Sequence, residues 1–156
     1  MKKKIELSNE VKTSIINFFN SVKELSNKNV IRSSNFIGNI AEFICCEFYG
    51  LDMCKNQREM GFDAMSNDKN KYKFQIKINN SAKKTNQTIG DPSKYSFLLL
   101  VITSNSFLFN NKFSSARVLI YKIPSEKLQK KKYIAKELIL NYKPEIILNS
   151  NLEIIE

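Results

Sequence analysis

The stretches Gly61-Phe62-Asp63-Ala64 and Tyr72-Lys73-Phe74-Gln75-Ile76-Lys77 decide the fold of this chain, because they predict the two strands of a β-hairpin. A polar turn at residues 66–71 connects them. In the second stretch apolar and polar residues alternate, as they do in a strand with one buried face. Phe74 and Ile76 then belong to the buried face, whereas Gln75 and Lys77 belong to the polar face.

Burying the apolar residues of both strands on one face fixes the parity of the strand register. The nearest such register places Asp63 opposite Gln75 and diagonal to Lys77. Opposite residues lie ~5 Å apart and diagonal residues ~7–8 Å apart. We therefore expect Asp63, Gln75 and Lys77 to cluster within reach of one ion or phosphate, although an amphipathic hairpin with a solvated face has the same pattern. The buried face would consist of Phe62, Ala64, Phe74 and Ile76.

Two helices are predicted before the hairpin, at residues 8–27 and 33–49. Ser8 is a plausible N-cap of the first helix. Ser33 or Ser34 could cap the second, and Gly50 could end it. Apolar residues recur at helical spacing in both segments. The first stripe is Val11, Ile15, Phe18, Val22 and Leu25, and the second is Ile37, Ile40, Ala41, Ile44 and Phe48.

Glu42 lies beside the apolar stripe of the second predicted helix. A carboxylate at the edge of a buried stripe is either a boundary residue or a ligand directed into a cleft. Glu47 lies on the opposite flank and is the second candidate. An ordinary solvated acid is the alternative for each of them.

Strands are also predicted at residues 52–56, 96–103 and 115–122, with a last one at 145–148. The run from Phe97 to Ile102 is continuously apolar, which is typical of a central strand covered on both faces. Pro124 is expected to open a helix that extends to about residue 138. Helices around one mixed sheet make the chain α/β or α+β, in a single domain over residues 1–156.

The composition narrows the possible functions. A formal net charge of +10 suits a polyanionic partner such as DNA or RNA, although a coding bias toward lysine would give the same charge. The chain has no histidine, which excludes Ser-His-Asp and Cys-His catalysis and His-ligated zinc. Its three cysteines, Cys45, Cys46 and Cys54, are a poor disulfide framework, so we expect a reducing, cytoplasmic compartment. No apolar run reaches the length of a membrane span, and no signal-peptide core follows the basic N-terminus.

Three motifs in order resemble the PD-(D/E)xK nuclease superfamily, which includes type II restriction enzymes and Holliday-junction resolvases. The similarity covers about residues 34–124. Gln75 stands where many members have an acid, and Gln-x-Lys variants resemble the branch that includes restriction enzymes for modified DNA. The motifs read Gly38-Asn39-Ile40-Ala41-Glu42, Gly61-Phe62-Asp63-Ala64 and Phe74-Gln75-Ile76-Lys77.

This resemblance implies a restriction-endonuclease-like central mixed β-sheet flanked by α-helices, and a Mg²⁺-dependent DNA endonuclease of restriction or defence type, with Mn²⁺ as a substitute. Asp63 and Glu42 would supply carboxylate ligands, and the Gln75 side-chain oxygen and the Ile76 carbonyl would complete the protein's share. Lys77 would orient or deprotonate the attacking water. Since one domain holds one site, cutting both strands of a duplex would favour a homodimer.

The polar, basic loop at residues 79–88 follows the second hairpin strand. Lys83 and Lys84, together with Lys73, would hold phosphates, whereas Asn86 and Gln87 would read base edges. A flexible surface loop is the alternative. A structure-specific resolvase or repair nuclease, a nucleic-acid-binding module without catalysis, and a protein-interaction domain also remain open as functions.

Overall fold

The computed structural model describes residues 8–55 and 60–155, apart from a few side chains of the first helix. The chain divides into two compact units, Met1–Ile40 and Ala41–Glu156, with the division inside helix α2 (Phe36–Tyr49). Each unit is considered by itself below. In the described part of the chain, no helix is long and apolar enough to cross a membrane.

The first unit contains helix α1 (Asn9–Asn27), close to the predicted 8–27. Its Phe18 ring lies 5.5 Å from the Phe19 ring and 5.9 Å from the Phe36 ring. Helix α2 begins at Phe36 rather than at residue 33. The reason is that Ser33 has another role, since its N–H and hydroxyl both donate to the Asn39 side chain.

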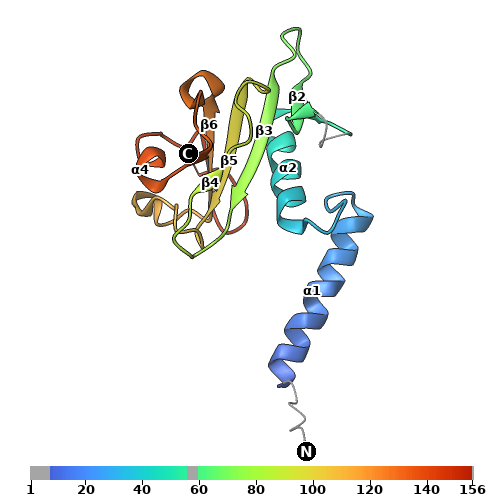
Figure 1. Ribbon diagram of the computed structural model, residues 1–156. Helices are drawn as coiled ribbons and strands as arrows, with labels where there is room; N and C mark the ends of the chain where they lie inside the picture. Colours follow the sequence, from blue (N-terminus) through green and yellow to red (C-terminus); the bar gives the residue numbers. More distant parts are fainter. Residues whose placement is uncertain (1–7, 56–59, 156) are drawn as a thin grey trace, which may run out of the picture. The chain divides into compact units, whose positions relative to one another are not determined.

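A six-stranded mixed sheet forms the second unit, in the order β1-β2-β3-β5-β6-β8 (Figure 1). Only β3 and β5 are parallel, and the other neighbours are antiparallel. Its strands are β1 (Leu51–Met53), β2 (Ala64–Ser66), β3 (Lys73–Asn79), β5 (Phe97–Thr103), β6 (Val118–Pro124) and β8 (Ile146–Leu148). Smaller elements are η1 (Asn111–Phe113), η2 (Ser125–Leu128), α4 (Lys136–Ile139) and a two-stranded sheet of β4 (Gln87–Thr88) and β7 (Tyr133–Ile134).

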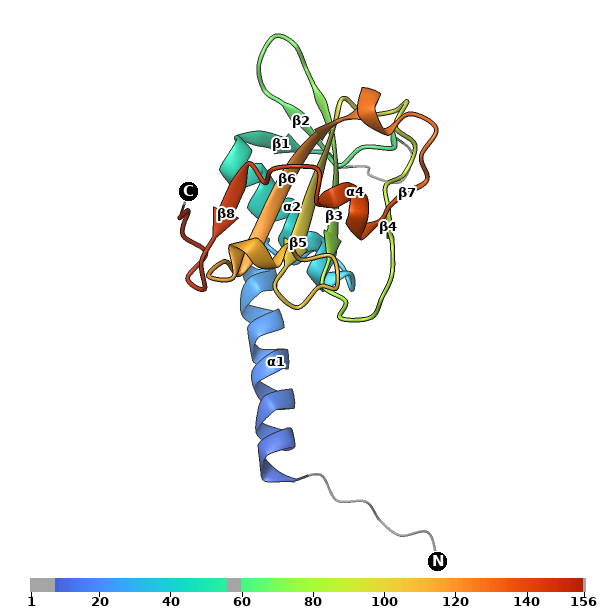
Figure 2. The ribbon, with the colours of Figure 1, turned by 90° about the vertical axis from the view of Figure 1, so that its left-hand side faces the viewer.

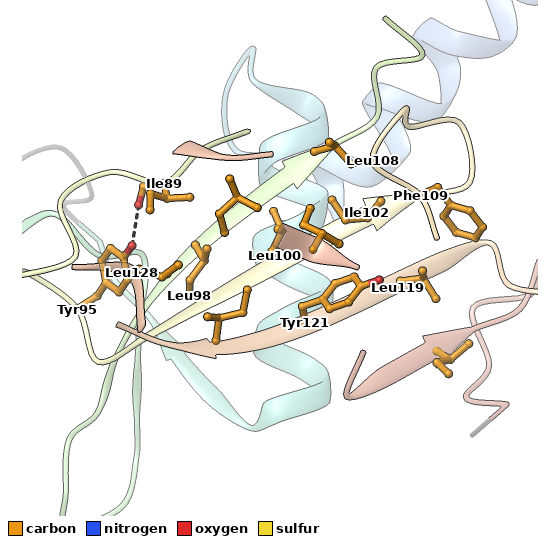
Figure 3. Packing of buried hydrophobic residues seen from close by; sticks show 14 of the residues in the cluster. Ile89, Tyr95, Leu98, Leu100, Ile102, Leu108, Phe109, Leu119, Tyr121 and Leu128 are labelled. Carbon is orange, nitrogen blue, oxygen red and sulfur yellow. Dashed lines mark hydrogen bonds between the residues drawn. The ribbon is translucent and has the colours of Figure 1, made fainter. Parts of the chain in front are cut away.

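The sheet is covered on both faces. Helix α2 and the short helix α4 lie on opposite sides of it (Figure 2). Ala41 and Cys45 of α2 pack on one face with Phe74, Ile76 and Leu99. The other face packs against the larger cluster drawn in Figure 3, which includes Leu98, Leu100 and Ile102. The predicted central strand is confirmed, because alternate β5 residues enter the two clusters.

Three sequence-based expectations differ from the structure. The helix predicted from Pro124 to residue 138 is wrong, because Gln129 has extended backbone angles and Lys130 has a φ of 66°, and both conformations interrupt a helix. On α2 the ends of the predicted stripe, Ile37 and Phe48, are 48% and 37% exposed. Phe62 lies in the cluster opposite to Ala64, because pairing of β2 with β3 begins only at Ala64.

Candidate functional site

Asp63 lies directly before β2, at the point where β2 and β3 separate. Ala64 pairs with Phe74, which is the predicted register, and the Asp63 N–H donates to the Phe74 carbonyl at 2.8 Å. Beyond Phe74, β3 continues to Asn79 without a β2 partner. The strands therefore form a fork, and Asp63 is the first residue inside it.

The Asp63 carboxylate closes this fork. Its Oδ2 accepts the Ile76 backbone N–H at 2.7 Å and also accepts the side-chain amide of Gln75. The Asp63 and Gln75 side chains are 8% and 6% exposed. The Ile76 N–H, on the open edge of β3, thus has a side-chain acceptor, as a buried N–H requires. Both bonds end on the same oxygen, Oδ2.

Electrostatics link Asp63 to two further predicted residues. Burial raises the pKa of Asp63 from an ordinary 3.8 to about 6, and the hydrogen bond from Ile76 opposes this rise. The negative charge of Glu42 raises the same pKa, whereas the ammonium of Lys77 lowers it. Both groups are therefore close enough to interact with the carboxylate. Because desolvation outweighs the favourable contacts, Asp63 is a buried acid whose environment does not fully compensate its charge.

Glu42 reaches the site from helix α2. The residue is 7% exposed, one position after Ala41, which packs on the sheet. The Cys45 thiol, one turn further along α2, lies within the fields of both Glu42 and Asp63, although burial is the main reason that its pKa is raised. Glu42 is thus a buried acid whose charge acts on Asp63, and its role as a ligand stays a prediction. Glu47 is exposed.

Lys77 lies two residues after Gln75 on the same strand and is half-buried. In the parallel pairing, Gln75 and Lys77 stand beside Leu98 and Leu100. Residues two apart in a strand project from the same face. Lys77 therefore shares the face of Gln75, and its ammonium acts on the Asp63 carboxylate from there.

The backbone of Ile76 contributes a further oxygen to the fork. The N–H and C=O of one strand residue point to the same neighbouring strand. Since the Ile76 N–H reaches Asp63, its carbonyl also faces the open edge of β3. Carboxylate, amide and carbonyl oxygens are the donors that a hard cation such as Mg²⁺ prefers.

The oxygen ligands available at the fork suit Mg²⁺ because two of them are carboxylates. In the described residues, no cluster of three or more Cys, Asp or Glu side chains suited to a metal is found. Mg²⁺ sites that act on phosphates commonly use one or two carboxylates and keep several waters. Asp63 and Glu42 with the oxygens of Gln75 and Ile76 meet this requirement, and substrate oxygens would complete the shell.

Gln75 lies close to the 89–96 loop, which the sequence did not mark as functional. Gly90 has a φ of 72°, and a Cβ placed on it would lie 3.3 Å from Gln75 Oε1. The Tyr95 hydroxyl donates to the Ile89 carbonyl at 2.9 Å and fixes the loop at that point (Figure 3). The sequence Gly90-Asp91-Pro92 could predict a turn here, but not its contact with Gln75.

The other predicted residues have no contact with the fork among the described interactions. Lys73 is exposed, with its Nζ 5.0 Å from the centroid of the Phe62 ring. Lys83, Lys84 and Asn86 are exposed in the loop after β3. No described hydrogen bond or ion pair connects these residues with Asp63.

Gln87 and Asn79 hold this loop to the sheet. The Gln87 Oε1 accepts from Asn79 Nδ2 at 3.2 Å. The buried Asn79 also accepts the Ser106 hydroxyl at 2.6 Å and the Ser81 N–H at 3.2 Å. Gln87 is thus part of an internal network, and Asn79 is a positioning residue that the sequence did not single out.

Comparisons with known proteins add no identification. No protein-family model matches the chain, and no curated protein matches it either. The functional argument therefore depends on the geometry of the fork and on the motifs.

Proposed function

We propose that this chain is a metal-dependent DNA endonuclease of the restriction-endonuclease-like kind, which hydrolyses phosphodiester bonds at the fork between β2 and β3. One observation carries the proposal. The buried Asp63 carboxylate lies between the Ile76 N–H and the Gln75 amide, within the fields of Glu42 and Lys77. Two acids, one amide and one ammonium from three segments of the chain thus converge.

The acids would hold the cation. Asp63 and Glu42 are both buried, and burial raises the pKa of Asp63 because it disfavours the charged form. A divalent cation would favour the ionised form of Asp63. When bound, Mg²⁺ supplies Lewis acidity and lowers the pKa of a coordinated water. Gln75 Oε1 and the Ile76 carbonyl would fix the remaining protein contacts.

Lys77 would act on the reacting atoms. Its ammonium, on the face of Gln75, can hold the attacking water in line with the phosphorus and balance the charge that develops on the phosphate. Removal of one such preorganised donor commonly lowers a rate about 10²–10³-fold. The exposed lysines Lys73, Lys83 and Lys84 would contact the DNA backbone, and the net charge of +10 supports a polyanionic substrate.

A nucleic-acid-binding module without catalysis is the second candidate, and Gln75 favours it. Its amide donates a hydrogen bond to the carboxylate that would bind the metal, so a neutral side chain occupies the place of a second acid. This bond must open or rotate before Gln75 Oε1 can bind a cation. A structure-specific resolvase would share the same site and would differ only in the substrate that it cuts.

The test is cleavage of supercoiled plasmid and of assorted duplexes, including DNA with modified bases, in Mg²⁺ or Mn²⁺ and in chelator. We expect metal-dependent cutting that is lost in Lys77→Ala. The matched control is Lys112→Ala, an exposed lysine that lies beside Ile147 of β8, at the opposite edge of the sheet from β2. Salt-sensitive binding without cutting on any of these substrates would identify the non-catalytic module.

A homodimer is part of this proposal, because one chain carries one site and a duplex has two strands. Light scattering of the purified protein with and without DNA measures it. A monomer that nicks one strand would refute the dimer and leave the hydrolytic site intact.

A further inference from the structure

An open pocket of about 530 Å³ lies at the start of β3, where the hairpin turn ends. Three lysines line it, Lys71, Lys73 and Lys94, and they come from two segments, the hairpin and the 89–96 loop. Ser93 and Ser96 add hydroxyl groups to the same wall. The pocket is thus lined by donors and by positive charge.

Among the residues that the structure describes, no ion pair joins a carboxylate to Lys71, Lys73 or Lys94. Asp91 accepts hydrogen bonds from the N–H and the hydroxyl of Ser93, and these bonds and the charge of Lys94 lower its pKa. Three cations around one concave surface attract an anion with several oxygens.

The fold holds the three lysines in place. Lys71 has a φ of 51°, in the left-handed region that ordinary residues seldom adopt, and Asp68 stabilises it by accepting the Lys71 N–H. The Lys94 stem packs on Gly61, where an added Cβ would lie 2.5 Å from Lys94 Cδ. Lys73 lies over the Phe62 ring.

Strand β3 connects a residue of the pocket, Lys73, with the residues of the fork. Lys73, Gln75 and Lys77 are successive residues on one face of β3, so neighbours in this row are roughly 7 Å apart. That spacing is comparable to the separation of consecutive phosphates along a nucleic-acid strand. Gly61, under the Lys94 stem, is only two residues before Asp63. A phosphate at the fork would therefore have its neighbour at the pocket.

We propose that the pocket of Lys71, Lys73 and Lys94 binds the backbone phosphate next to the one that is cut. This inference rests on the proposed nuclease function for its meaning, but the binding itself needs no metal. The pocket would set the position of the strand relative to Asp63 and Lys77. The ligand class is a phosphodiester strand, rather than a single small anion.

The test is binding of a short fluorescent DNA duplex to the full chain in chelator, measured by anisotropy over a range of salt concentrations. Lys94→Gln and Lys71→Gly should each weaken binding several-fold and lower the slope of log K against log salt by about 1. The matched control, Lys112→Gln, carries the same charge change and should bind more nearly like the unaltered chain. Glycine adopts the positive φ of position 71 without a steric cost. Weaker DNA binding by Lys71→Gly therefore cannot come from a failure to fold.

Unchanged binding in Lys94→Gln and Lys71→Gly would overturn the proposal. Inorganic phosphate alone serves as a second probe. If the variants lose phosphate binding but bind the duplex as tightly as the unaltered chain, the proposal is also overturned. The nuclease function is tested separately, in the plasmid assay with metal, because the binding assay in chelator does not depend on cutting. Weaker duplex binding in a chain that never cuts DNA would therefore support the pocket and refute the enzyme.

Discussion

The Gln75 amide donates a hydrogen bond to the buried Asp63 carboxylate, at the position where a second acid would repel it. In the structure this contact replaces the charge repulsion of an acidic pair with a neutral donor and a charged acceptor. Hydrogen bonds to charged groups contribute roughly 1.5–3 kcal/mol. Gln75 thus stabilises the metal-free fork and competes with a cation for Asp63.

Replacement of Gln75 by glutamate tests this competition. Gln75→Glu removes the donor and adds a charge beside a buried carboxylate, so in chelator we expect a loss of roughly 2 kcal/mol in the free energy of unfolding. Mg²⁺ should restore more stability in the variant than in the original chain, since its site holds more negative charge. Urea unfolding with and without Mg²⁺ measures both effects. Equal stability of the two proteins in chelator would contradict the role assigned to Gln75.

The raised pKa of Asp63 predicts how stability depends on pH. Its value is about 6 in the fold and near 3.8 in the unfolded chain, so the folded state binds more protons between these values. The metal-free protein should therefore lose stability as pH rises through this window, by at most about 3 kcal/mol from this group.

Asp63→Asn should abolish that loss and make the metal-free protein more stable than the original chain at neutral pH, because the amide carries no buried charge. Urea unfolding across the window, in chelator, checks this expectation. Glu42→Gln provides a control, since removal of its charge should lower the Asp63 pKa and shrink the window without abolishing it. A pH-independent original chain would contradict the assignment.

Parts of this architecture follow from local sequence. The alternation in residues 72–79 predicts strand β3, and the apolar run from Phe97 predicts the central strand β5. The register of β2 against β3 follows from parity, because a slip of one residue would exchange the two faces of one strand relative to the other. These features follow from the spacing of apolar and polar residues, which can be read directly from the sequence.

Other features depend on contacts between distant segments. The strand fork cannot be seen in sequence, because nothing in residues 73–79 indicates that β2 pairs only with the first part of β3. The contact of Gly90 with Gln75 and the pocket around Lys94 depend on how the 89–96 loop returns to the sheet. The segment after Pro124 was predicted wrongly because its backbone angles at Gln129 and Lys130 override a helix-compatible composition.

Alanine substitutions at two glycines distinguish the effect of contact with Gln75 from the effect of backbone strain. Gly90 and Gly50 both have positive φ, 72° and 61°, so alanine at either position should cost about 1 kcal/mol of stability. A Cβ at Gly50 meets no atom within 4 Å, whereas at Gly90 it would press on Gln75 Oε1. Only Gly90→Ala should therefore also weaken Mg²⁺ binding and cleavage. Calorimetry and plasmid cutting compare the pair, and equal metal affinity in both variants would remove Gly90 from the site.

The Asn79 network predicts that the basic loop after β3 must be held in place to bind DNA. Asn79→Ala removes bonds to Ser81, Ser106 and Gln87, so we expect a loss of roughly 2 kcal/mol and faster amide exchange in residues 80–88. Asn110→Ala is the matched control, because Asn110 is also buried and accepts the Lys112 N–H at the start of η1.

Both substitutions should lower the free energy of unfolding, but only Asn79→Ala should weaken DNA binding, because only this residue positions the backbone that carries Lys83 and Lys84. Hydrogen exchange locates the loosened segment, and anisotropy in chelator measures the affinity. If Asn79→Ala loosens residues 80–88 and still binds duplex as tightly as Asn110→Ala does, the loop has no part in holding the substrate. The phosphate contacts would then have to come from the lysines of the pocket.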